Sequence, residues 1–73
     1  MSYNRTIQTL CGVDEKTARH IEAYLRLQYG TLDALSRERI VFEYENGGSE
    51  GSIKEAIQLD PDGAEQLAQD FGL

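Results

Sequence analysis

The chain is constrained most by Gly12, a glycine that separates two helical patterns near the N-terminus. The apolar side chains before it recur at the spacing of one helix face: Tyr3, Ile7, Leu10 and Cys11. Glycine supplies the backbone freedom that a sharp turn needs, and Asp14 is a suitable N-cap for a following helix. The sequence therefore predicts a tight connection between two helices.

The second helix is expected to end near Tyr29, where Gly30 can adopt a left-handed conformation. Thr31 can then cap a short third helix that ends at about residue 39. Residues 1–39 are thus predicted to form a helical part of the domain.

The hydrophobic period changes from helical to alternating after residue 39. Ile40, Phe42 and Tyr44 fall on one face of a predicted strand over residues 40–45. The glycines in the segment 46–51 are typical of a hairpin loop, and residues 52–59 are predicted to form the returning strand. We recognise no internal repeat in the sequence.

Asp60 and Pro61 are typical of the start of a last helix, with the aspartate as N-cap. The apolar residues that follow share one stripe: Ala64, Leu67, Ala68 and Phe71. We therefore expect one small α+β domain over residues 1–73 in the order α-α-α-β-β-α, with a helical part at 1–39 and a β-hairpin plus a C-terminal helix at 40–73. Its free strand edges would allow a second copy to pair, so a homodimer is one expected assembly.

The net charge of −6 is concentrated in the second half of the chain, where Lys54 stands alone against eight carboxylates. Such a negative field favours basic protein surfaces, including surfaces that bind nucleic acid. We expect seven of these carboxylates to be exposed and to bind a partner: Glu43, Glu45, Glu50, Glu55, Asp62, Glu65 and Asp70.

The first functional hypothesis is a non-enzymatic acidic module that binds a partner protein with a basic surface. Such a partner could be a nucleic-acid-binding protein that the chain inhibits by presenting DNA-like charge, and small phage-encoded inhibitors are similar in size and charge. An enzyme is not expected, because His20 and Cys11 are single and no serine lies in a nucleophile motif. We also expect no cofactor and no metal, because the chain has neither a nucleotide-type glycine loop nor a complete calcium loop.

The segment from Thr6 to Leu35 resembles the helix-hairpin-helix family. Gly12, Val13, Lys16 and Thr17 match the family's hairpin by type and spacing, Ala18 and Ile21 match the positions that pack its helices together, and residues 29–35 (YGTLDAL) are similar to the continuation in DNA-repair nucleases and ligases. The resemblance implies that the hairpin and the next helix start present backbone N–H groups to a phosphate.

The alternative hypothesis is therefore a nucleic-acid-binding module that contacts phosphates at the hairpin. Its binding residues would be Gly12, Val13, Lys16, Thr17 and Arg19. The chain departs from the family at Asp14, which replaces the second hairpin glycine. A carboxylate there competes with phosphate for the same N–H groups and repels it.

The single cysteine and the hydropathy pattern lead to an expected cellular location. Cys11 cannot form an intramolecular disulfide, and the chain has no leader-like segment and no long apolar run. We expect a cytoplasmic protein that does not associate with membranes.

Overall fold

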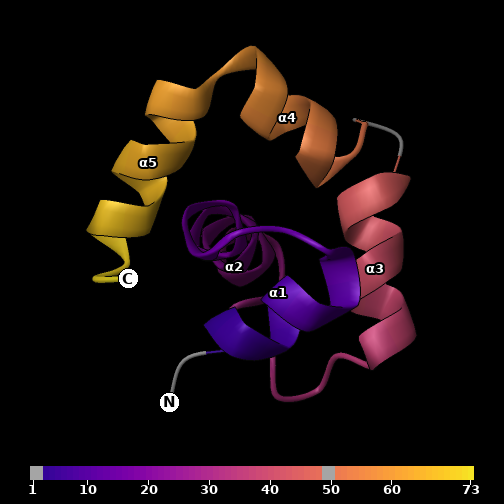
Figure 1. The fold of residues 1–73 in the computed structure, drawn as a ribbon. Coiled ribbons are helices and arrows are strands. Elements are labelled where there is room, and N and C mark those ends of the chain that lie inside the picture. Colours follow the sequence, from indigo (N-terminus) through magenta and orange to yellow (C-terminus); the bar gives the residue numbers. More distant parts are fainter. Residues whose placement is uncertain (1–2, 49–50) are drawn as a thin grey trace.

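The computed structural model describes residues 3–48 and 51–73, and these form five helices. In chain order they are α1 (Asn4–Cys11), α2 (Glu15–Tyr29), α3 (Arg37–Glu45), α4 (Ile53–Leu59) and α5 (Pro61–Asp70) (Figure 1). The described residues contain no strand, and their only β-type pairing is an isolated bridge between Gly48 and Gly51. The predicted α+β fold and its β-hairpin are therefore wrong.

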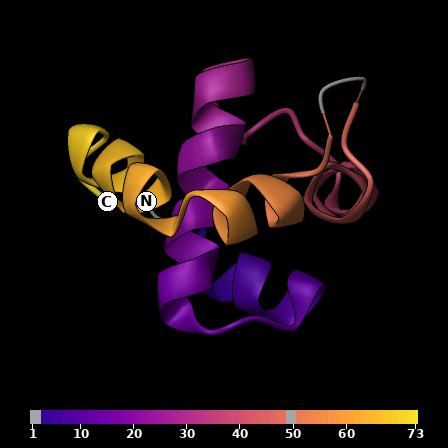
Figure 2. The ribbon, with the colours of Figure 1, turned by 90° about the horizontal axis from the view of Figure 1, so that it is seen from above.

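The long helix α2 lies at the centre of the fold, and the other four helices surround it (Figure 1). Figure 2 shows α1 crossing one end of α2, with α3 and α5 on opposite sides of it. The buried side chains of α2 include Ala18, Ile21 and Leu25. Residues from α1, α3, α4 and the connection after α2 pack around them: Ile7, Leu32, Ile40, Tyr44 and Ile53.

Residues 40–45 form a helix because their apolar pattern also fits a helical period. Ile40 and Tyr44 are four residues apart and both are buried, so they lie on one helix face. Phe42, which the strand prediction placed beside them, is instead 44% exposed. Ser36 is the N-cap of this helix, and its hydroxyl accepts a hydrogen bond of 3.0 Å from the N–H of Arg39.

The predicted returning strand is also a helix with a serine N-cap. The Ser52 hydroxyl accepts a hydrogen bond of 3.1 Å from the N–H of Glu55, and this Ser-x-x-Glu spacing is that of a capping box. The preceding glycine-rich segment ends α3 instead of turning a hairpin. Gly47, at a φ of 63°, donates its N–H to the carbonyl of Phe42 over 2.9 Å.

The predicted short helix after Gly30 is absent, and α3 begins only at Arg37. The Thr31 hydroxyl accepts a hydrogen bond from the N–H of Asp33, which makes a local turn instead of a helix start. Leu32 is buried in the core and anchors this connection.

Four predicted helix boundaries are confirmed, among them the end of α2 at Tyr29. Gly12 adopts the left-handed conformation at a φ of 65° and ends α1. The Asp14 carboxylate caps α2 by accepting a hydrogen bond of 2.8 Å from the N–H of Thr17. Asp60 caps α5 in the same way through the N–H of Gly63, at 2.9 Å.

The helix pairs α1–α2 and α4–α5 are similar at three corresponding positions, which the sequence analysis did not recognise. These positions share burial or capping in both pairs: Ile7 and Ile53, Asp14 and Asp60, and Ala18 and Ala64. The second pair has Gln58 where the first has Gly12.

Candidate functional site

The hairpin between α1 and α2 turns at Gly12, and three of its N–H groups are already occupied. The N–H groups of Gly12 and Val13 both donate to the carbonyl of Gln8, at 2.9 and 3.3 Å. The N–H of Thr17 donates to the Asp14 carboxylate, and hydrogen bonding by the Thr17 side chain, followed by that of its N–H, lowers the pKa of Asp14. The hairpin therefore presents an ionised carboxylate where a phosphate would have to bind.

The cations near this hairpin lie among carboxylates. Lys16 is exposed and shares a shallow hollow with Glu15, Arg19 and Glu65. The Arg19 guanidinium binds Glu65 at 2.5 Å and the carbonyl oxygen of Leu73 at 2.6 Å. The structure thus brings together the predicted residues Lys16 and Arg19, but the Arg19 guanidinium donates its hydrogen bonds to Glu65 and Leu73 of the same chain.

Glu65 links α5 to α2 through two basic side chains. Its Oε1 atom accepts hydrogen bonds from Arg19 and from the buried His20, whose Nε2 atom lies 2.9 Å away. The Arg19 guanidinium, followed by His20 and Gln69, lowers the pKa of Glu65 to about 2. Glu65 was expected to bind a partner, but in this structure it holds two helices together.

Glu43 was expected to be exposed, and this expectation is wrong. The residue is only 6% exposed, because position 43 faces inward on a helix that also buries Ile40 and Tyr44. The Tyr29 hydroxyl donates to its Oε1 atom over 2.8 Å, and the Arg39 guanidinium lies 3.8 Å from Oε2. Glu43 therefore stabilises the contact between α2 and α3 and is not available to a partner.

The remaining predicted carboxylates are exposed, except for Glu50, which lies outside the described residues. Glu45 ends α3, Glu55 lies on α4, and Asp62 and Asp70 lie on one stripe of α5. The side chain of Asp70 also accepts a hydrogen bond from Gln66. Leu59, at the junction of α4 and α5 and one helical turn after Glu55, is 77% exposed. We call Glu55, Leu59, Asp62 and Asp70 the α4–α5 surface.

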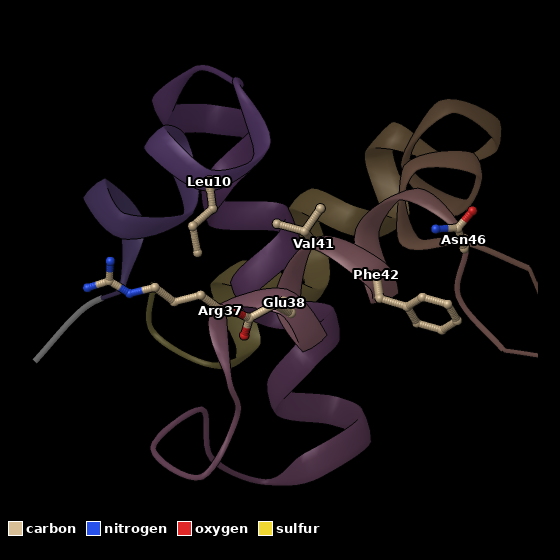
Figure 3. Close-up of a pocket in the computed structure, with 6 residues that line it drawn as sticks. All are labelled: Leu10, Arg37, Glu38, Val41, Phe42 and Asn46. Atoms are coloured by element: carbon tan, nitrogen blue, oxygen red, sulfur yellow. The ribbon is translucent and has the colours of Figure 1, made fainter.

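A second surface feature is a groove between α1 and α3, shown in Figure 3. It has a volume of about 530 Å³, and six residues line it: Leu10, Arg37, Glu38, Val41, Phe42 and Asn46. Leu10 from α1 and Val41 from α3 point toward one another, whereas Phe42 points outward (Figure 3). We call this feature the α1/α3 groove, and the sequence analysis did not predict it.

The single cysteine and the single histidine lie in different surroundings. Partial burial, followed by the charge of Glu45, raises the pKa of the Cys11 thiol, whereas His20 is bound to Glu65. In residues 3–48 and 51–73, no three His, Cys, Asp or Glu side chains gather into a metal-binding group. None of the helices in this part of the chain combines the length and apolar character that crossing a bilayer requires.

Comparison of the chain with protein-family models, with curated proteins and with solved structures gave no match.

Proposed function

We propose that the chain is a non-enzymatic acidic module that binds a basic surface of a partner protein through the α4–α5 surface. The observation that carries this proposal is Leu59, a large apolar side chain that is 77% exposed and has Glu55 one turn before it on the same face. An exposed apolar side chain with a polar rim is the usual arrangement of a protein interface. Here the rim is acidic, so the complementary partner is basic.

The charge of the C-terminal residues also supports a basic partner. Residues 51–73 contain Lys54 against five carboxylates, and Glu65 alone among these is held in an ion pair between helices. Proteins that bind nucleic acid present basic surfaces, so they are the partner class that this surface fits best. Binding there would block nucleic acid from the same partner.

Nucleic-acid binding by the chain itself is less well supported. The hairpin donors are engaged by Gln8 and Asp14, and the equivalent turn before α5 has Asp62 where the first has Lys16. A phosphate at either helix start would meet a carboxylate within the first turn.

A pair of binding assays separates the two functions. The first is gel retardation with duplex and single-stranded DNA at low and moderate salt, where we expect no retarded species. The second is titration with a synthetic basic peptide of roughly 18 residues that carries leucines and lysines on a helical repeat. We expect saturable binding to this peptide that weakens as salt increases.

Leu59→Ser should weaken peptide binding about tenfold, because it removes the apolar centre of the surface. Leu27→Ser is the matched control, since Leu27 is 61% exposed but lies near the end of α2, outside the α4–α5 surface. Equal affinities for the two variants would contradict the proposed surface. Salt-sensitive DNA retardation that is reduced by Lys16→Glu would favour the nucleic-acid function instead.

A further inference from the structure

A basic hollow adjoins the α1/α3 groove, in contrast to the acidic α4–α5 surface. Arg5 and Arg37 line a hollow of about 200 Å³ that shares Leu10 and Arg37 with the groove. Both residues are exposed, and in the described part of the chain neither guanidinium has an ion-pair partner. On a chain with a net charge of −6, two free cations beside an apolar groove favour an anionic occupant.

Phe42 gives the groove an apolar anchor. Its ring is 44% exposed, and the Arg39 guanidinium lies 5.4 Å from the ring centroid, where it forms a cation–π contact. This contact restricts the ring without covering it. Half-buried Leu10 and Val41 continue the apolar surface from Phe42 toward α1 (Figure 3). An exposed aromatic ring of restricted motion binds a partner with little further loss of side-chain entropy.

We propose that the α1/α3 groove binds a short acidic amphipathic helix of a partner protein. The groove follows a stripe of α3 in which Glu38, Phe42 and Asn46 recur every fourth residue, a length of roughly 12 Å or two helical turns. A third helix is the element that fits the furrow between two neighbouring helices.

The positions of the charges set the orientation of the bound helix. Its apolar residues cover Leu10, Val41 and Phe42, and its carboxylates lie at the end where Arg5 and Arg37 are exposed. Glu38 lines the groove itself, so the bound helix has no carboxylate beside that residue. This surface is separate from the α4–α5 surface, and the chain can therefore contact two partners of opposite charge.

Three synthetic peptides of roughly 16 residues test this proposal by NMR titration of the isotopically labelled chain. The first is an acidic amphipathic helix, the second has lysine in place of each glutamate, and the third is a scrambled acidic peptide without an apolar face. We expect binding of the first peptide to saturate below about 1 mM and to shift the NMR signals of amides in α1 and α3. The lysine and scrambled peptides should bind at least about tenfold more weakly, since each lacks either the charge or the apolar stripe.

Two variants assign the binding to the groove. Phe42→Ala and Arg37→Glu should each weaken the acidic peptide about tenfold, and both residues are exposed, so the fold is retained. Phe71→Ala and Lys16→Glu are the matched controls, because they remove an exposed ring and an exposed cation outside the groove. The controls should bind the peptide within about twofold of the wild type.

Several results would overturn the proposal. These are a failure of the acidic amphipathic peptide to saturate at about 1 mM, equal binding of the lysine peptide, or amide shifts confined to α4 and α5. Self-association that shifts the α1 and α3 amides without peptide would assign the groove to a second copy of the chain and would also overturn it. Leu59→Ser should leave this binding unchanged, so failure here is distinguishable from failure of the α4–α5 surface.

Discussion

Replacing Tyr29 by phenylalanine tests whether the buried Glu43 carboxylate depends on a single hydroxyl. The Tyr29 hydroxyl is the one hydrogen-bond donor to this carboxylate among the described residues, at 2.8 Å. The other carboxylate oxygen is buried without a hydrogen bond and has only the Arg39 guanidinium at 3.8 Å. Tyr29→Phe keeps the ring and removes only the donor.

The expected loss follows from the environment of the two groups. A hydrogen bond to a charged group contributes about 1.5–3 kcal/mol to the free energy of unfolding. Tyr29 is 38% exposed, so water can partly replace its hydroxyl, and we expect a loss at the lower end, about 1.5–2 kcal/mol. In a domain of this size each kcal/mol lowers Tm by about 4–8 °C, which predicts a decrease of about 6–16 °C.

Urea unfolding followed by circular dichroism measures this loss directly. Tyr24→Phe is the control, because Tyr24 is half-buried but its hydroxyl makes no hydrogen bond within the described residues. The control should stay within about 0.5 kcal/mol of the wild type. If Tyr29→Phe also does so, the hydroxyl does not stabilise Glu43 and the reasoning is refuted. In a Glu43→Gln background the same substitution should have a smaller effect, because the acceptor is then neutral.

Three further perturbations test the backbone, the interhelical ion pair and a helix cap. Gly12→Val should lower the free energy of unfolding by about 1–2 kcal/mol, because Gly12 has a φ of 65° that β-branched residues rarely adopt. Gly12→Asn should lower it less, because asparagine adopts this conformation more readily, and thermal melting of the two variants measures the difference. The pKa of Glu65 is lowered to about 2 from 4.5, so its stabilising contribution is present above pH 4.5 and is lost as the pH falls toward 2. Urea midpoints should therefore fall more steeply for the wild type than for Glu65→Gln across that interval, and parallel curves would contradict the pairing. Ser52→Ala should destabilise α4 by about 1 kcal/mol, measured by urea unfolding, because it removes the N-cap.

The ends of the fold could be predicted because helix boundaries are set by local chemistry. Gly12 and Asp14 determine one turn, and Asp60 with Pro61 determines the start of the last helix, whatever packs against them. Each signal involves residues within a single helical turn. The sequence contains this information completely.

The middle of the chain could not be predicted from its hydrophobic period. Apolar residues at 40, 42 and 44 fit the alternating pattern of a strand, but Ile40 and Tyr44 also fit one face of a helix. In addition, Glu43 is buried, although carboxylates are usually exposed to solvent. Two local signals favoured helix, namely the serine caps at Ser36 and Ser52. The i,i+4 pair of Arg39 and Glu43 also favoured helix.

The candidate surfaces depend on contacts that no local signal contains. The α1/α3 groove exists because Leu10 and Val41, from helices far apart in the sequence, come to face one another. Likewise, the sequence does not distinguish Glu65 from the exposed carboxylates, because only the packing of the helices brings Arg19 and His20 beside it. Composition located the acidic half of the chain, and only the packing shows which carboxylates are available.

The buried carboxylates also explain how a thin core selects one arrangement of helices. Small buried residues such as Ala18 and Ala64 let helices approach closely but distinguish poorly between neighbouring registers. Glu22, by contrast, accepts a hydrogen bond from the N–H of Tyr3, and Glu43 accepts one from Tyr29. A one-residue shift of either helix would separate Tyr3 from Glu22 or Tyr29 from Glu43, and the loss of a hydrogen bond to a buried carboxylate is unfavourable. We infer that these two carboxylates fix the positions of α1 and α3 relative to α2, and thereby the shape of the groove between them.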